Sequence, residues 1–202
     1  NPASTLLPGG ILNDGFGLEW VSEVVGKADP YGQGWERGRA DAGDAICAEN
    51  QLLHGQKVDN VKQIFARPFY DPATDDRLNP VRFVDRITVP VFLAGAWQDE
   101  QTGPGFAELL DRFPPTKGTR LTAYNGVHPD GFAPAIYAEW RAFLDLYVAG
   151  RKPGFSRGQR EIAPIIFQDV FSTPMTLPPD RFAAVSDLAA ARALWEGEPR
   201  YR

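Results

Sequence analysis

The sequence predicts an α/β protein in which part of a parallel sheet follows a lobe built of helices. The first observation is a continuous apolar run at residues 87–97, typical of a strand buried on both faces. The second is the order strand, helix, strand, helix over residues 87–148, which is characteristic of parallel sheets. The third is helical spacing of apolar side chains, without strand patterns, over the first 80 residues.

Residues 1–80 are expected to form a helical lobe. Its helices are predicted at residues 14–25, 34–53 and 60–66, and the second is expected to end near His54, taken as a cap or surface residue. The adjacent carboxylates Asp75 and Asp76 lie in a turn-rich segment, and we expect them to be solvated.

Residues 81–150 are expected to form the sheet core. The predicted elements are strands at 87–97 and 119–124, with Pro90 near the start of the first, and helices at 105–113 and 134–148. Because two parallel strands make a marginal sheet, further strands are expected from a part of the protein outside this chain. Residues 151–202 are polar and rich in proline, and we expect a mostly irregular connector with one short helix near 186–195.

Composition narrows the class of protein. The chain has 202 residues, 43% of them hydrophobic, and a net charge of −5 without a basic cluster, which argues against a nucleic-acid partner. No apolar run approaches the roughly 18 residues of a membrane span and no targeting segment is visible, so we expect a soluble chain with no membrane partner. One cysteine, two distant histidines and no phosphate-binding glycine loop predict no metal and no cofactor.

Two side chains stand where a parallel sheet collects its functional groups. Asp99 follows the first predicted strand, and His128 follows the second. Since the carboxyl ends of parallel strands meet at one edge of the sheet, both are expected in one crevice. There a carboxylate can fix the tautomer of an imidazole and leave its other nitrogen free as a general base. Glu100 is expected to point away from Asp99, and Asp130 to be a turn residue beside Gly131.

A nucleophile is harder to find in this chain. The pattern G-x-S-x-G occurs once, at residues 154–158, around Ser156. A nucleophile elbow follows a buried strand and opens a helix, whereas Arg151, Lys152 and Pro153 precede this serine and no helical pattern follows. We therefore interpret Ser156 as a chance match and expect the nucleophile outside this chain.

The segment from Ile87 to Asp99 resembles the sequence I-x-V-P-V-L-x-x-x-G-W-x-D of the cocaine esterase and X-Pro dipeptidyl-peptidase-like α/β-hydrolases. The resemblance implies a partial α/β-hydrolase fold with the last strands and helices of the sheet. It also implies a helical cap before them and a connector toward a C-terminal domain after them. It assigns the triad acid to Asp99, the triad histidine to His128, and a place in the substrate pocket to Trp97.

The resemblance further implies a serine hydrolase that cleaves an ester or amide of a small molecule through an acyl-enzyme, without a cofactor. This chain would supply acid and histidine, be inactive alone, and act with the missing N-terminal portion of the same protein. Two alternatives stay open: a non-catalytic binding or interaction module on a degenerate hydrolase scaffold, and a hydrolase with an aspartate nucleophile.

Overall fold

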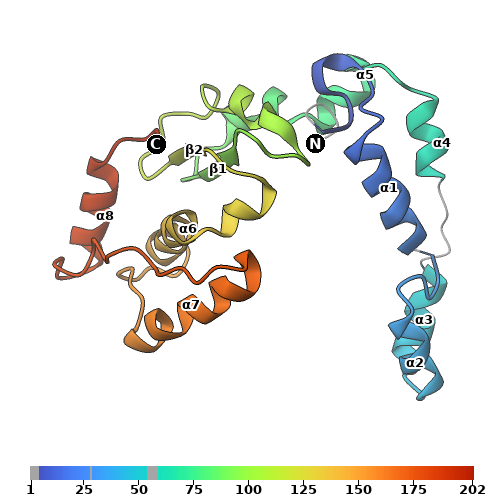
Figure 1. Ribbon diagram of the computed structural model, residues 1–202. Helices are drawn as coiled ribbons and strands as arrows, with labels where there is room; N and C mark the ends of the chain where they lie inside the picture. Colours follow the sequence, from blue (N-terminus) through green and yellow to red (C-terminus); the bar gives the residue numbers. More distant parts are fainter. Residues whose placement is uncertain (1–4, 28, 54–58) are drawn as a thin grey trace. The chain divides into compact units, whose positions relative to one another are not determined.

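A computed structural model describes residues 5–27, 29–53 and 59–202. The chain is mixed α/β and divides into two units, Asn1–Asn79 and Pro80–Arg202, each of which is described by itself (Figure 1). Within the described ranges, no helix is long and apolar enough to cross a membrane.

The first unit is helical. Its elements are η2 (Pro8–Gly10), α1 (Phe16–Lys27), α2 (Trp35–Asp41), α3 (Ala45–Leu53), α4 (Asn60–Phe65), α5 (Pro72–Asp75) and η3 (Asp76–Leu78). The helices predicted at 14–25 and 60–66 are thus confirmed. The single helix predicted over 34–53 is wrong, because Gly43 adopts φ +94° and breaks it, and Asp44 then accepts from Cys47 N at 2.9 Å to start α3. The predicted cap at His54 lies outside the described residues.

Little apolar surface is buried in the first unit. Leu7 is its only hydrophobic residue below 9% exposure among those described, whereas Trp20, Trp35 and Phe69 are more than half exposed. Polar groups occupy several of the buried positions instead. The solvated pair expected at 75–76 is wrong for Asp75, whose buried carboxylate accepts from Arg67 Nη2 and Asp71 N, both at 2.8 Å.

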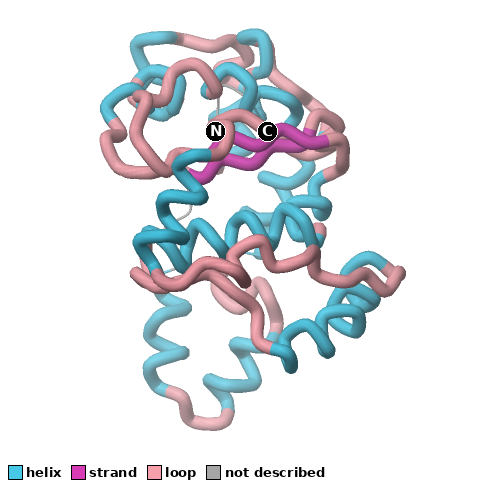
Figure 2. The backbone as a smooth tube through the Cα atoms, turned by 90° about the vertical axis from the view of Figure 1, so that its left-hand side faces the viewer, coloured by secondary structure: helices cyan, strands magenta, loops and turns pink. Residues whose placement is uncertain are grey.

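The second unit contains the parallel sheet. Strand β1 (Phe92–Ala96) pairs with β2 (Arg120–Tyr124) in parallel, in the register Phe92 with Arg120 and Ala96 with Tyr124. Figure 2 shows the two strands side by side, with the C-terminus next to them. The first strand is shorter than predicted and begins after Pro90, which has no N–H to donate to a neighbouring strand.

The chain itself supplies a further partner for β2. Leu121 N donates to Arg200 O at 2.9 Å, Arg202 N to Leu121 O at 3.0 Å, and Ala123 N to Arg202 O at 2.8 Å. These bonds form a parallel bridge between Leu121 and Tyr201. Strand β2 is therefore paired on both sides. We expected further strands from outside the chain, but residues 200–202 of the chain itself supply part of this pairing.

The helical elements of the second unit are η4 (Pro80–Arg82), η5 (Val84–Arg86), η6 (Gly103–Leu109), η7 (His128–Phe132), α6 (Pro134–Tyr147), α7 (Arg157–Phe171) and α8 (Leu188–Gly197). The helices predicted at 134–148 and 186–195 are confirmed. The α-helix predicted at 105–113 is wrong: Gly103, at φ +67°, and Pro104 begin a 3₁₀ turn instead. That turn lays the Phe106 ring on Gly95 of β1, where a Cβ would lie 2.3 Å from ring carbon Cγ.

The expectation of a mostly irregular stretch over 151–202 is wrong. This stretch carries α7 and α8 and contributes to two of the three buried apolar clusters of the described residues. Trp195 of α8 is almost fully buried against α6, and its Nε1 donates to Gly118 O at 2.8 Å. The segment is thus an integral layer of the second unit.

Candidate functional site

Backbone pairing continues beyond the two strands and holds the following loops together. Trp97 N donates to Tyr124 O at 3.0 Å, and Gln98 N donates to Gly126 O at 3.2 Å. The Gln98 side chain makes a second hydrogen bond to the same residue, since its Oε1 accepts from Gly126 N at 2.8 Å. The residues immediately after these pairs are brought together at the carboxyl edge of the sheet.

Asp99 and His128 meet at this edge. Asp99 Oδ2 lies 2.9 Å from His128 Nδ1, so the two predicted residues form a direct contact. The other carboxylate oxygen, Oδ1, accepts from Gln101 N at 2.9 Å and Thr102 N at 2.7 Å. The Asp99 side chain is 13% exposed and the His128 side chain 45%, so the acid is fixed within the loop while the imidazole faces solvent.

The surroundings of Asp99 keep it ionised. Burial favours the neutral acid, but hydrogen bonds from Thr102, His128 and Gln101 outweigh burial and lower the pKa of Asp99. A carboxylate with three donors can hold one orientation and still present a full negative charge to the imidazole.

Glu100 has a role that the sequence interpretation missed. It was expected to point away from Asp99, yet its Oε2 accepts from the backbone N–H of His128 at 3.0 Å. This hydrogen bond is the largest cause of a lowered pKa for Glu100. Two consecutive carboxylates thus bind His128: Asp99 contacts the imidazole ring of the histidine, and Glu100 accepts from its backbone N–H.

The second loop is shaped by Asp130, which was expected to be a turn residue. Its Oδ2 accepts from Val127 N at 2.8 Å at the start of η7. Gly126 permits this closure, because a Cβ there would lie 2.6 Å from the same oxygen. Tyr124, which precedes this loop, is half-buried; burial first, and then the charges of Asp99 and Asp130, raise its pKa.

Trp97 lies on the same loop as Asp99. Its side chain is half-exposed, and its ring centroid is 5.1 Å from that of Phe106. The ring therefore has one supported side and one side open to solvent.

Ser156 occupies a different kind of position. It is the N-cap of α7, where its Oγ accepts from Gln159 N at 3.2 Å and Gln159 Oε1 accepts from Ser156 N at 2.9 Å. The expectation that no helix follows is wrong, since α7 does. Among the described elements, however, the one directly before Ser156 is α6 and not a strand, and no hydrogen bond between described residues joins Ser156 to Asp99 or His128.

The chemistry available to the pair follows from its geometry. A proton on Nδ1 is donated to Asp99, which leaves the Nε2 lone pair as the basic position of a neutral imidazole. In the part of the chain that the structure describes, no side chain hydrogen-bonds to Nε2 and no group of three metal-ligating side chains occurs. The arrangement thus orients the imidazole through Nδ1 and leaves Nε2 open.

Comparison with protein-family models, curated proteins and solved structures finds no match to this chain.

Proposed function

We propose that this chain supplies the acid and the histidine of a serine hydrolase that cleaves an ester or amide bond of a small molecule. The proposal rests on the 2.9 Å contact between Asp99 and His128, with the acid anchored and Nε2 open. The resemblance of residues 87–99 to the cocaine esterase-like hydrolases supports the same assignment and the role of Trp97 in the substrate pocket.

In the proposed reaction, the serine comes from a segment outside this chain. His128 Nε2 takes the serine proton as the serine oxygen bonds to the substrate carbonyl carbon. The imidazolium then returns the proton to the leaving alcohol or amine as the bond to that group breaks, and an acyl-enzyme remains. Water then attacks the acyl-enzyme with its proton passing to His128. The proton returns to the serine oxygen as the acyl bond breaks, and the carboxylic acid product leaves. Asp99 stays ionised throughout and stabilises the imidazolium.

A second candidate is a non-catalytic binding module on a hydrolase scaffold. Its supporting observation is that His128 Nε2 has no hydroxyl or thiol partner among the described residues. The two candidates differ in whether the natural polypeptide holds a reactive serine opposite this nitrogen.

A fluorophosphonate probe separates the candidates, because it phosphonylates an activated serine and releases fluoride. We expect labelling of the complete natural polypeptide and none of the 202-residue chain. His128→Ala should abolish the labelling. The matched control Ser156→Ala, which removes the serine of the G-x-S-x-G pattern, should leave labelling unchanged.

Absence of labelling in the complete polypeptide, with correct folding by circular dichroism, would exclude the serine hydrolase and favour the binding module. Labelling of this chain at Ser156 would contradict the assignment of the nucleophile to another segment.

A further inference from the structure

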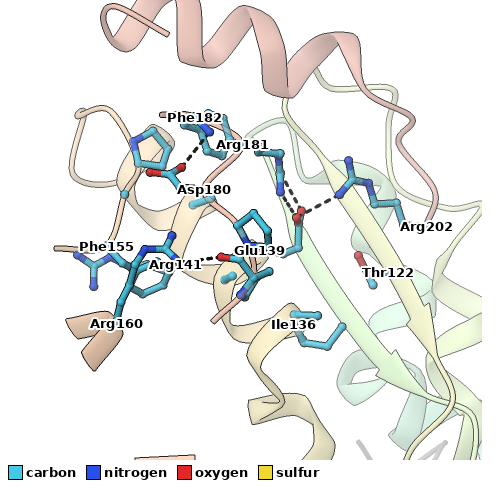
Figure 3. A pocket seen from close by; sticks show the side chains of 17 residues that line it. Thr122, Ile136, Glu139, Arg141, Phe155, Arg160, Asp180, Arg181, Phe182 and Arg202 are labelled. Atoms are coloured by element: carbon cyan, nitrogen blue, oxygen red, sulfur yellow. Dashed lines mark hydrogen bonds and ion pairs between the residues drawn. The ribbon is translucent and has the colours of Figure 1, made fainter. Parts of the chain in front are cut away.

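A cleft of about 300 Å³ lies between α6, the start of α7 and residues 178–182 (Figure 3). Its wall includes Thr122 of β2 and Arg202, but no residue of the loops that carry Asp99 and His128. Whatever this cleft binds is therefore independent of the proposed acyl transfer.

The charge of the cleft is opposite to that of the chain. Its wall carries four arginines, which are Arg141, Arg160, Arg181 and Arg202, against two carboxylates, Glu139 and Asp180. The chain as a whole has a net charge of −5. Concentration of arginines in one concave site of an acidic protein is a signature of anion recognition.

The carboxylates near the cleft are already shared among several arginines. Glu139 accepts from Arg181 and, at 3.1 Å, from Arg202, as Figure 3 shows. Glu198 pairs with Arg181 at 3.1 Å, Arg202 at 3.0 Å and the buried Arg120 at 2.9 Å. Three arginines thus share two carboxylates. Burial, followed by repulsion from Arg202, lowers the pKa of Arg120, as expected where positive charge is in excess.

Arg160 is the arginine with free charge. It donates to Pro178 O at 2.8 Å, a neutral acceptor, and makes no ion pair with any residue that the structure describes. By contrast, Arg141 pairs with Asp145 at 3.0 Å. The Phe155 ring lies near both guanidinium groups, with its centroid 5.7 Å from Cζ of Arg160 and 5.9 Å from Cζ of Arg141.

Thr122 of β2 belongs to the wall of the cleft, but its hydroxyl is enclosed by protein. Its residue is 7% exposed, and its Oγ1 has no hydrogen-bond partner among the described residues. Because this oxygen exposes almost no surface, the ligand contacts of the cleft must come from its arginines and its apolar wall. Figure 3 shows Thr122 and Arg160 on opposite sides of the cleft.

The remaining wall is apolar, with Ile136, Phe155, Phe182 and prolines 153, 178 and 179. An anion that fills the cleft must therefore carry an apolar body. A carboxylate matches the planar fork of an arginine, and an aromatic or aliphatic body matches this wall. Inorganic anions would satisfy the charge alone.

We propose that this cleft binds a small organic carboxylate, with the carboxylate on Arg160 and its body against Phe155 and the apolar wall. Isothermal titration of the 202-residue chain with benzoate should give saturable binding of one molecule per chain. Benzamide, which has the same shape without the charge, should bind at least tenfold more weakly. Sodium phosphate at equal ionic strength should also bind more weakly than benzoate.

Arg160→Gln should weaken benzoate binding about tenfold or more, since it removes a charge-assisted hydrogen bond. Arg160→Lys, which keeps the charge and loses the fork, should fall between Gln and the natural residue. The matched control is Arg157→Gln, three residues earlier on α7, where the side chain is almost fully exposed and pairs with Glu161. This variant should bind benzoate as the natural chain does.

Lack of saturable benzoate binding, or equal weakening by Arg157→Gln and Arg160→Gln, would overturn the site. Phosphate binding as tight as that of benzoate would overturn the assignment to an organic carboxylate. Thermal melts of each variant distinguish a lost ligand contact from a lost fold. None of these outcomes depends on the nucleophile of the proposed hydrolase.

Discussion

Asp99 uses one oxygen to hold His128 and the other to hold its own loop. Asp99→Asn should retain the loop contacts and turn an amide N–H toward Nδ1. The neutral imidazole would then carry its proton on Nε2, where it cannot act as a base. Nitrogen-15 chemical shifts of the His128 ring measure this change directly. In the proposed hydrolase, the variant should reduce kcat by about 10⁴-fold.

Glu100→Gln is the matched control for this change. Gln Oε1 can still accept from the His128 backbone N–H, so the tautomer should remain as in the natural chain. A proton on Nε2 in both variants would contradict the assignment of tautomer control to Asp99.

Asp75 predicts a pH dependence for the first unit. A hydrogen bond from Asp71 N lowers its pKa most; burial opposes this, and Arg67 adds to the lowering. A pKa lower in the folded state gives stability that is fully present above the unfolded value, about 3.9, and is lost as pH falls through the folded value. Because solvent screens the half-exposed Arg67, Asp75→Asn should destabilise this unit by only about 1 kcal/mol at pH 7.

The difference between Asp75→Asn and the natural chain should shrink toward zero near pH 2. Urea unfolding followed by circular dichroism at the two pH values measures it. The matched control is Asp41→Asn, at an exposed end of α2, which should leave the free energy of unfolding at pH 7 nearly unchanged. A constant difference for Asp75→Asn at both pH values would contradict the titration of Asp75.

Some of the site could be predicted from the sequence and some could not. Asp99 and His128 were accessible because each follows a recognisable strand, and parallel strands end at the same edge. The contact between Glu100 and the His128 backbone could not be predicted. It depends on the turn of the loop after Asp99, which forms where the amides of Gln101 and Thr102 donate to Asp99. Thr122 gave no signal at all, since a threonine in a strand is ordinary and only packing shows its hydroxyl without a partner.

At the scale of elements, β1 and η6 pack closely because Gly95 of β1 has no side chain where the Phe106 ring of η6 lies. Gly95→Ala would place a Cβ 2.3 Å from Phe106 Cγ and force the ring, or the strand, to move. We expect a loss of about 1–3 kcal/mol in the free energy of unfolding. Denaturant unfolding of the second unit measures it.

Gly158→Ala on α7 is a matched control with the opposite sign. A Cβ there meets nothing within 4 Å, so the change should stabilise α7 by about 0.5–1 kcal/mol through helix propensity. Equal effects of the two glycine variants would contradict the steric explanation for Gly95.

Prediction of the elements failed where a few residues override a periodic pattern. Apolar spacing over 34–53 and 105–113 favours helices. Gly43 adopts a backbone angle that interrupts the first, and Gly103 with Pro104 begins a 3₁₀ turn in place of the second. The helix α7 was missed because no apolar side chain occurs in its first five residues and Pro164 lies inside it. Its capping box, Ser156 with Gln159, is a sequence signal that could have revealed its start.

At the scale of the whole molecule, the two units differ in how much apolar surface they bury. All three buried apolar clusters of the described residues lie in the second unit, whereas large side chains of the first unit are exposed. Since apolar burial is the main stabilising contribution, we expect the first unit to open more readily. Amides of α1 to α4 should exchange with deuterium faster than those of β2 and α6. Equal protection of both groups would contradict this ranking.

The C-terminal residues that flank β2 have a consequence for the order of folding. Arg120 bonds to Trp195 and Glu198 across 75 and 78 positions of sequence, and Trp195 bonds to Gly118 across 77. Contacts between residues this far apart in sequence form only after a long loop has closed, and the closure costs chain entropy. Such contacts therefore slow folding. On the ribosome, β2 emerges long before its flanking residues do. The edge of the sheet that carries Asp99 and His128 therefore reaches its final rigidity only after α8 has been synthesised and has docked.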